Sequence, residues 1–594
     1  MRMGRLARGL APDGERPSRG DTYRVVARLM GYVAPYRTLS LISLAAMVVY
    51  AVSEVATPWF IKDAVDSVVP PQSSSDLATA MVLMVVSAAV GYAANYLHLV
   101  TLSRVGQNLL TGLRTSTFNH MQQLSLSYFQ RTEVGSNMSR VQNDVQQLQE
   151  FLSIFVLSMG DVVRLVGFVI AMLLMKWDLA LVTMGVIPVL FLIMVFWQRI
   201  SWKHFMDVRR NIASVNSALQ ENISGVRVIQ SLHRQDANLR QFDQVNRRYL
   251  ETSLTSTRLS SALNPSVELL TAVATALVIV LGGIMVLRDD LAVGTLVAFA
   301  LYVQRLFDPI RSLTMHYGQL QRATTSGQHI FEILDLEPEI VDNPGARDLP
   351  PLTGRVSFDH VGFSYVEGVR VLDGINLEVS PGQKVALVGP TGAGKTTLAS
   401  LLSRLYDVDT GRVTVDGHDV REVRRSSLNR QISVVPQEPF LFSGDIRENI
   451  RYSRPDATSR EVEEAARAVG AHDFIAGMEH GYDTVVEERG VNLSPGQRQL
   501  ISLARALVGD PRIVILDEAT ATVDSQTEAL VQRGLATVLQ DRTALIIAHR
   551  LSTVQGADRI VVLDRGRVAE EGTHQELMEA GGLYARLYAL GREA

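Results

Sequence analysis

Six long apolar segments occupy the chain before residue 310 and place the strongest constraint on its fold. Each is long enough to cross the hydrocarbon core of a bilayer, which takes about 20 residues of helix. Lipid offers no partners for unpaired backbone groups, so such segments must form helices. The predicted spans lie near 39–61, 77–102, 151–175, 179–197, 267–287 and 291–307. The sequence therefore predicts an all-α membrane domain.

Basic residues are unevenly distributed among the connections between these segments. The stretch 1–38 contains eight Arg, 103–150 contains four Arg, and 198–266 contains ten Arg or Lys. The three short connections carry one basic residue each, namely Lys62, Lys176 and Arg288. Because Lys and Arg accumulate on the cytoplasmic side, we expect both termini and both long connections to be cytoplasmic. The chain is expected to lie in the plasma (inner) membrane.

The long connections 103–150 and 198–266 repeat apolar residues at helical spacing and contain no Pro before Pro265. Two arms of about 24 residues would reach roughly 36 Å at 1.5 Å per residue. We therefore expect each to form a helical hairpin that extends far into the cytoplasm. The Arg-, Gly- and Pro-rich stretch 1–21 is expected to be disordered, and TYRVVARLMGYVAPYR to form an interfacial helix.

A few ionisable residues fall inside the predicted spans. These are Glu54, Asp161, Arg164 and Glu268. Such groups are costly in lipid and usually face a bundle interior or water. Asp161 and Arg164 lie three residues apart on one helix face, which favours a structural ion pair. Glu268 is also compatible with a position at the membrane edge. The alternative for all of them is a place along the route of a transported substrate.

Composition excludes several other classes of function. The chain has no Cys, so it can form neither a disulfide framework nor a Cys-ligated metal site. The formal net charge of −4 gives no reason to expect nucleic acid as a partner. The 12 His residues show no spacing typical of metal ligands. A metal hydrolase or a nucleic-acid-binding protein is therefore not expected.

Polar, Pro-containing sequence around 335–353 indicates a linker between two domains. We place the membrane domain at 22–325, the linker at 326–352 and a soluble domain at 353–594. The soluble part alternates short β-rich apolar runs with helical patterns, which is typical of an α/β fold.

KVALVGPTGAGKTT, at 384–397, is the most specific motif of the chain. A predicted strand leads into G-x-x-x-x-G-K-T, and a predicted helix follows. In this arrangement backbone N–H groups surround phosphates, Lys395 reaches the β- and γ-phosphates, and the Thr396 hydroxyl binds Mg²⁺. The predicted ATP-binding residues here are Gly389, Pro390, Thr391, Gly392, Ala393, Gly394, Lys395, Thr396 and Thr397.

Three further strand ends carry polar residues. RIVILDEAT, at 512–520, ends a buried strand with Asp517, a predicted Mg²⁺ ligand, and Glu518, a predicted general base. TALIIAHR ends with His549, and ISVVPQEPF contains Gln437. Ligands gather at the carboxyl ends of parallel strands, which favours functional roles. An exposed acidic pair and a structural histidine are the alternatives.

In LSPGQ, at 493–497, Ser494 suits a helix N-cap and Pro495 suits the first helical position. A capped surface helix explains this segment, but a helix N-terminus can also hold an anion.

With these motifs the chain resembles an ABC transporter of the exporter type, a half-transporter with one membrane domain fused to one ATPase domain. The resemblance covers residues from 22 onward. The matching elements are Walker A at 389–397, Walker B at 512–520 with Glu518, the Q-loop Gln437, the D-loop at 521–524 with Asp524, the switch His549, the adenine-stacking Tyr365 and the signature at 493–497.

The resemblance implies a six-helix transmembrane domain followed by an α/β P-loop (RecA-like) ATPase domain with a helical and an antiparallel β subdomain. It also implies an obligate dimer. ATP would lie between Walker A of one chain and the signature residues Ser494, Gly496 and Gln497 of the other. Mg²⁺ would be held by Thr396, Gln437 and Asp517. Glu518, His549 and Gln437 would be catalytic.

The implied function is ATP-driven export of a drug- or lipid-like substrate by alternating access. Exporter-fold importers of siderophores or vitamins and ATP-gated channels or regulators are the alternatives. The signature has Pro495 where LSGGQ is commonest, and the D-loop reads ATVD. Such chains resemble the catalytically intact partner of heterodimeric exporters, although homodimers with these signatures also occur. Either a different homologous chain or a second copy is therefore a possible partner.

Overall fold

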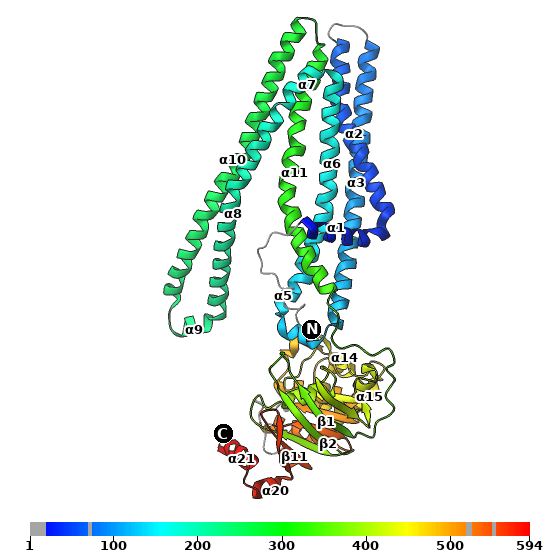
Figure 1. Cartoon of the computed structure of the whole chain (residues 1–594), viewed down its shortest axis with the longest axis vertical. Helices are drawn as coiled ribbons and strands as arrows, with labels where there is room; N and C mark the ends of the chain where they lie inside the picture. The colour runs from blue at the N-terminus through cyan, green and yellow to red at the C-terminus, as the bar shows by residue number, and fades with distance from the viewer. Residues whose placement is uncertain (1–18, 69–73, 518–524, 549–553, 594) are drawn as a thin grey trace. The chain divides into compact units, whose positions relative to one another are not determined.

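The computed structural model describes residues 19–68, 74–517, 525–548 and 554–593 (Figure 1). The chain divides into two compact units. The first contains the residues up to 122 together with 134–336. The second contains 123–133 and 337–594. Three predicted site residues, Glu518, Asp524 and His549, lie outside the described residues. Most of the stretch 1–21, which was expected to be disordered, lies outside them as well.

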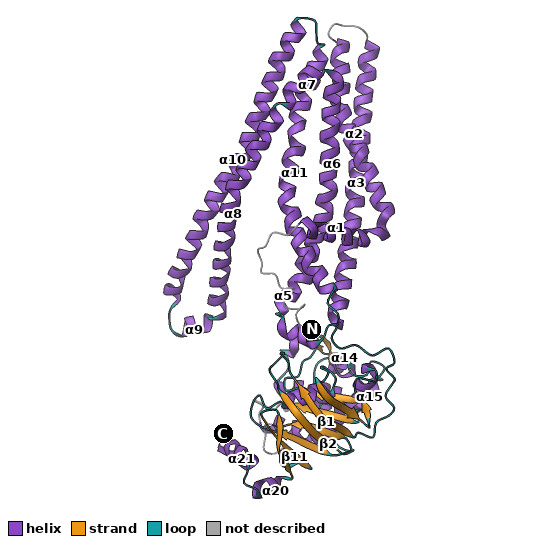
Figure 2. Cartoon of the chain, viewed as in Figure 1, coloured by secondary structure: helices purple, strands orange, loops and turns teal. Residues whose placement is uncertain are grey.

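In its described residues the first unit contains helices joined by short turns and loops, and no strand (Figure 2). Its long helices are α1 (Arg19–Val33), α2 (Arg37–Val68), α3 (Ser74–Gln123), α6 (Val145–Met175), α7 (Trp177–Met184), α8 (Val186–Ser224), α10 (Gln235–Leu287) and α11 (Val293–Leu334). In the part of the chain that the structure describes, six helical stretches are long and apolar enough to cross a membrane. The prediction of a six-span, all-α membrane domain is confirmed.

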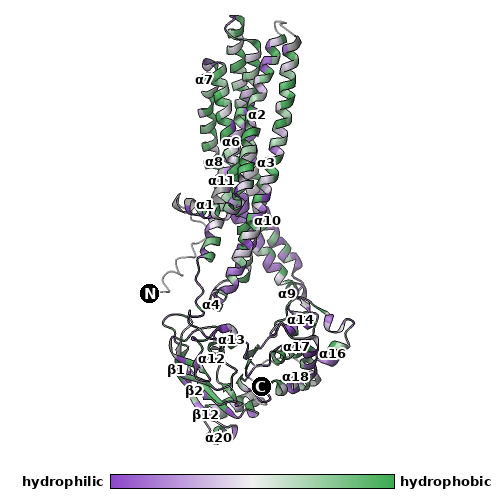
Figure 3. Ribbon diagram, turned by 90° about the vertical axis from the view of Figure 1, so that its right-hand side faces the viewer, coloured by the Kyte–Doolittle hydropathy of each residue, from purple (hydrophilic) through white to green (hydrophobic). Residues whose placement is uncertain are grey.

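The two long connections form the expected helical extensions. α8 and α10 continue well beyond the apolar spans and are joined by the short helix α9 (Val226–Ser231). Figure 3 shows hydrophobic residues along the spans and hydrophilic residues on α10 close to α9. The other extension is formed by α3 and by the segment before α6, which contains α4 (Leu126–Arg131), α5 (Val134–Ser139) and a π-helical turn at Arg140–Asp144.

The last span begins at the close approach of α2 and α11. The Gly294 N–H donates to Asp66 Oδ1 at 2.7 Å. A Cβ on this residue would lie 2.3 Å from the Lys62 carbonyl oxygen, so only Gly fits here. In the sequence, Gly294 suggests an interruption of the span. In the structure it lies in the first turn of α11 and allows this contact.

α11 continues to Leu334 and so passes through the first part of the expected linker, 326–352. The helix continues because HIFEIL keeps an apolar face, with Ile330, Phe331 and Ile333 buried. The remainder of the linker is attached to the second unit by Arg404, whose side chain is 2% exposed. This guanidinium donates to the carbonyl oxygen of Val341 at 3.2 Å and to that of Val423 at 3.0 Å.

The second unit contains two main sheets. The larger has the order β12-β11-β3-β10-β9-β6, and its strands from β11 to β6 are parallel. The smaller, β2-β1-β4-β5, is antiparallel. The strands are β1 (Val356–Phe363), β2 (Leu372–Val379), β3 (Lys384–Val388), β4 (Thr410–Val415), β5 (His418–Asp419), β6 (Ile432–Val435), β9 (Ile513–Asp517), β10 (Thr543–Ile547), β11 (Arg559–Asp564) and β12 (Arg567–Gly572).

Helices accompany these sheets. They include α12 (Lys395–Leu402), α14 (Ile446–Arg451), α15 (Ser459–Ala468), α16 (His472–Ala476), α17 (Pro495–Val508), α18 (Ser525–Leu539), α20 (His574–Glu579) and α21 (Leu583–Glu593). α14, α15 and α16 lie in the chain between β6 and α17, and their apolar residues share one core cluster with α17. The unit therefore has the expected parallel α/β core, antiparallel β subdomain and helical subdomain.

Candidate ATP site

The phosphate-binding loop lies between β3 and α12, and its glycines adopt conformations that other residues reach only with strain. Gly389 has φ +153°, and a Cβ there would lie 2.2 Å from the Leu563 carbonyl oxygen. Gly394, the N-cap of α12, has φ +102°. These angles direct backbone N–H groups around the loop, next to a helix N-terminus. This arrangement fits the phosphates of a nucleotide.

Lys395 is the first residue of α12, and only 5% of it is exposed. Its Nζ donates to the carbonyl oxygens of Gly389 at 2.7 Å and Pro390 at 3.0 Å. Burial lowers the pKa of Lys395 below its ordinary value, and the nearby carboxylate of Asp517 opposes this shift. The ammonium is thus held inside the loop by neutral acceptors, so it can interact with phosphate oxygens.

The strand order brings the other motifs to the same edge of the sheet. β10 lies between β3 and β9, with Ile547 level with both Leu387 and Asp517. Asp517 ends β9, and Gln437 is exposed two residues after the end of β6. Glu518 directly follows Asp517 in the sequence but lies outside the described residues, as does His549 after β10. The sheet therefore brings together the predicted Walker A and Walker B segments.

The oxygen donors near the loop fit a magnesium ion. Thr396 is exposed at the start of α12, and Asp517 is close enough to Lys395 to influence its pKa. Within the described residues no group of three His, Cys, Asp or Glu could hold a metal ion. Mg²⁺ is typically held by one or two protein oxygens together with substrate phosphates, so this donor set is suited to it.

Tyr365 follows β1 and belongs to a group of three aromatic rings. Its ring centroid lies 4.8 Å from that of Phe363 and 5.2 Å from that of Tyr406, both in edge-to-face geometry. Its hydroxyl is hydrogen-bonded to the Thr397 hydroxyl at 3.1 Å, which links it to α12. The ring is therefore fixed beside the phosphate-binding loop, as a residue that stacks on adenine requires.

A contact that the sequence did not predict connects this aromatic group to α4. The Tyr406 hydroxyl donates to Gln130 Oε1 at 2.7 Å, and Arg131 Nη2 donates to the Tyr365 carbonyl oxygen at 3.4 Å. Ser125 Oγ accepts from the Glu339 N–H at 2.8 Å. Residues 123–133 thus pack within the second unit although the chain on both sides belongs to the first. α4, within the connection 103–150 that was expected to form a helical hairpin, therefore contacts the residues on the adenine side of the site.

The signature segment has the predicted local structure. Ser494 is the N-cap of α17 and Pro495 is its first residue. The Gln497 N–H donates to Ser494 Oγ at 3.2 Å, and the Ser494 N–H donates to Gln497 Oε1 at 2.9 Å, which completes a capping box. Ser494 is exposed, whereas Gly496 is buried. The cap therefore presents a rigid helix N-terminus to solvent.

The ionisable residues within the spans separate into two groups. Arg164 forms ion pairs with Asp161 on its own helix and with Glu54 of α2, the latter at 3.1 Å. The predicted Asp161–Arg164 pair is confirmed, and Glu54 joins it. Glu268 is exposed on α10 and forms no ion pair with any described residue. The structure therefore does not bring Glu268 to the other three.

Two parts of the chain match known families. Residues 40–310 match the family described as ABC transporter transmembrane region, and residues 372–521 match the family described as ABC transporter. The chain belongs to the ABC transporters. The relatives of this ABC transporter include the uncharacterised ABC transporter ATP-binding protein YknV of Bacillus subtilis. The two are 39% identical over 94% of this chain and 93% of the relative.

Another relative, the ATP-dependent lipid A-core flippase of Desulfotalea psychrophila, is 35% identical over 95% of this chain and 99% of its own. Among solved structures, a bacterial Atm1-family ABC exporter with ATP bound superposes with a TM-score of 0.76. That chain is 29% identical, and the match covers 94% of this chain and 99% of that one.

This ABC transporter is therefore a multi-pass membrane protein with the exporter fold, and its ATPase domain binds ATP. ATP hydrolysis drives its export activity. A single chain carries one membrane domain and one ATPase domain, so it is a half-transporter that works as a dimer.

Proposed function

We propose that this ABC transporter exports hydrophobic or amphipathic, drug- or lipid-like compounds across the plasma membrane. Its termini and ATPase domain lie in the cytoplasm, in agreement with the excess of Lys and Arg in the long connections. The observation that carries this proposal is the fusion of six apolar helices to an ATPase domain with a complete set of nucleotide-site motifs. The lipid A-core flippase among its relatives supports a lipid-like substrate.

At the ATP site, the backbone of 389–394 and Lys395 hold the phosphates, and Tyr365 stacks on adenine. Thr396, Gln437 and Asp517 hold Mg²⁺, which would neutralise charge on the phosphate oxygens. Glu518 accepts a proton from the attacking water, His549 orients the γ-phosphate and the water, and Asp524 belongs to the D-loop. Ser494, Gly496 and Gln497 bind the γ-phosphate of the ATP held by the partner chain.

ATP contacts both chains and closes the ATPase domains because it binds the closed pair more tightly than the open one. The helical extensions pass this closure to the spans, which change from inward-open to outward-open. The α4 contacts with Tyr406 and Tyr365 support this route, since they attach one extension to the adenine side of the site. Hydrolysis resets the cycle.

We propose that the partner is a different, homologous half-transporter. Pro495 in the signature and the ATVD D-loop, in a chain that keeps Glu518, support this pairing. Affinity purification of the tagged chain from its native host, followed by mass spectrometry, tests it. An equimolar second ABC chain is the expected result. Recovery of this chain alone as a dimer would favour the homodimer.

Vesicle orientation tests the direction of transport. Inverted vesicles expose the ATPase domain, so added ATP should drive uptake of a fluorescent amphipathic dye such as Hoechst 33342. The Glu518→Gln protein should bind ATP but neither hydrolyse it at steady state nor drive uptake. Undiminished ATP hydrolysis by this variant would contradict the assignment of the base.

Two other outcomes favour the alternatives. ATP-dependent accumulation in ATP-loaded right-side-out vesicles would indicate an importer. An ATP-opened conductance that persists in the Glu518→Gln protein would indicate a gated channel.

A further inference from the structure

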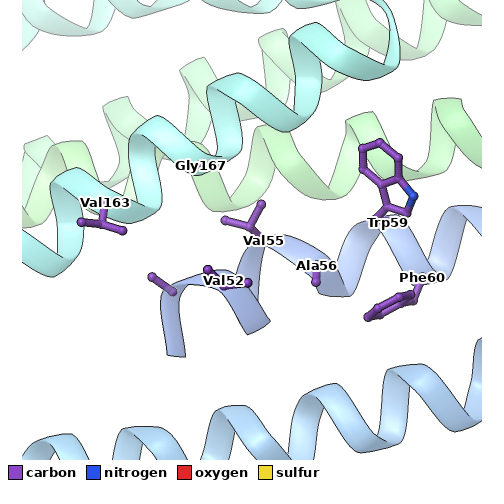
Figure 4. A pocket seen from close by; sticks show the side chains of 8 residues that line it. Val52, Val55, Ala56, Trp59, Phe60, Val163 and Gly167 are labelled. Atoms are coloured by element: carbon purple, nitrogen blue, oxygen red, sulfur yellow. The ribbon is translucent and has the colours of Figure 1, made fainter. Parts of the chain in front are cut away.

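An open apolar groove with a volume of about 380 Å³ lies between α2 and α6 (Figure 4). Residues lining it include Val52, Val55, Trp59 and Phe60 of α2 and Val163 and Gly167 of α6. In Figure 4 the aromatic side chains lie at one end and Val163 at the other. A Cβ on Gly167 would lie 2.7 Å from Val55 Cγ2, so this glycine lets the two helices approach at the centre of the groove. The lining is suited to a hydrocarbon chain.

Charged groups adjoin one end of this groove. Glu54 stands between the lining residues Val52 and Val55 in the sequence, and Arg164 directly follows Val163. Arg164 is ion-paired with both Glu54 and Asp161. His316 Nδ1 lies 3.9 Å from Asp161 Oδ2 and 3.0 Å from Ser158 Oγ. Both carboxylates therefore already have a cationic partner in Arg164.

Arg305 of α11 adds a second guanidinium at this end. Its Nη1 donates to the backbone carbonyl oxygen of Glu54 at 3.3 Å. Among the residues that the structure describes, no carboxylate lies within 4.0 Å of it. A cation inside a membrane span is costly without a counter-charge or water. The charges of the two carboxylates and the two guanidiniums sum to zero. Because both carboxylates are paired with Arg164, however, Arg305 remains able to bind an additional anion.

The charged end of the groove is its cytoplasmic end in the proposed orientation. α2 runs from the cytoplasmic side to the outer side, and Glu54 comes before Trp59 and Phe60 along this helix. The charges therefore lie closer to the cytoplasm than the two aromatic residues do.

We propose that this groove binds a membrane lipid with a net anionic headgroup, with an acyl chain along α2 and α6 and the headgroup at Arg305. The inference rests on the proposed export function and names its substrate class. A lipid of the cytoplasmic leaflet has its headgroup toward the cytoplasm and its tails toward the bilayer midplane. The site has the same polarity, so such a lipid can enter without inverting.

Quenching of Trp59 tests this site directly, because bromine on an acyl chain quenches tryptophan only at close range. The full-length transporter is reconstituted without ATP in phosphatidylcholine. Either phosphatidylglycerol or phosphatidylcholine with brominated acyl chains is then titrated in. Subtracting the Trp59→Phe signal isolates Trp59 from the other three Trp residues. Brominated phosphatidylglycerol should reach half-maximal quenching at a mole fraction about fivefold lower than brominated phosphatidylcholine does. This ratio is typical of the free energy of one ion pair.

Arg305→Gln should abolish this preference, and Arg305→Lys should keep most of it. Arg311→Gln is the matched control, because Arg311 is on the same helix but is already paired with Asp308 at 3.4 Å. Equal quenching by the two brominated lipids in the unmodified protein would overturn the proposal, whatever the variants do. A preference that survives Arg305→Gln would overturn it as well.

The quenching assay contains no ATP, so it tests lipid binding independently of the proposed export function. ATP hydrolysis and dye uptake by the same reconstituted protein report on that function. Intact transport together with equal quenching by both lipids would remove only the anionic-lipid site.

Discussion

The Lys395 ammonium is held by the backbone carbonyl oxygens of the phosphate-binding loop, so its loss should affect ATP binding directly. Lys395→Ala removes the one ammonium buried in the loop, and we expect the Kd for ATP to rise about tenfold or more, the loss typical of a charge-assisted hydrogen bond. Titration with a fluorescent ATP analogue measures it. Lys384→Ala, at the other end of β3, is the control and should bind ATP normally. An unchanged Kd in Lys395→Ala would contradict the role of this residue.

Ser494 combines two roles that one pair of substitutions can separate. Its hydroxyl caps α17, and it is proposed to contact the γ-phosphate bound to the partner. Asp is also a good N-cap, whereas Ala is not, so Ser494→Ala should lower stability by about 1 kcal/mol and Ser494→Asp should not. The added negative charge should nevertheless repel phosphate and abolish ATP hydrolysis.

Thermal unfolding and ATPase assays of the two Ser494 variants provide the readouts. Normal hydrolysis by a stable Ser494→Asp protein would show that Ser494 only caps the helix.

α4 is the element whose contacts bear most directly on coupling. Burial raises the pKa of the Tyr406 hydroxyl, which keeps it protonated as the donor to Gln130. Tyr406→Phe keeps the ring beside Tyr365 but removes this hydrogen bond. We expect dye uptake per ATP hydrolysed to fall about twofold to fivefold, in line with the loss of about 0.5–1 kcal/mol, while the KM for ATP stays within about twofold.

Gln130→Glu keeps an acceptor for the Tyr406 hydroxyl and should restore most of the coupling that Gln130→Ala loses. A large rise in the KM for ATP in Tyr406→Phe, with coupling unchanged, would mean that the hydroxyl serves only the nucleotide pocket.

Elements whose signal is local could be predicted from the sequence. The spans, the phosphate-binding loop and the Ser494 cap each depend on residues close together in the chain, and the structure has them where expected. Gly294 was harder to interpret, because its role depends on Lys62 and Asp66 of a different helix. α11 also runs past the expected domain boundary, since periodic apolar residues continue beyond the membrane span.

Contacts between distant residues could not be predicted in the same way. Gln130 and Tyr406 are 276 residues apart, and nothing in either local sequence indicates the other. Glu54 likewise joins Asp161 and Arg164 only because α2 packs on α6. The roles of Glu518 and His549 come from motif resemblance, and their side chains lie outside the described residues.

As a whole, the transporter is proposed to use ATP hydrolysis to move an amphipathic substrate across the membrane. The most direct measurement uses proteoliposomes, with the co-purified partner where one is found, that contain phosphatidylglycerol with a nitrobenzoxadiazole label on its acyl chain. Dithionite destroys the label only in the outer leaflet, so the protected fraction reports lipid in the inner leaflet.

ATP added to the external medium reaches only those transporters whose ATPase domains face outward. The outer leaflet corresponds to the cytoplasmic leaflet for these molecules, so export moves lipid from the outer to the inner leaflet. ATP should raise the protected fraction with the unmodified protein and leave it unchanged with Glu518→Gln. An unchanged protected fraction during active ATP hydrolysis, or an equal rise with Glu518→Gln, would contradict the proposed export.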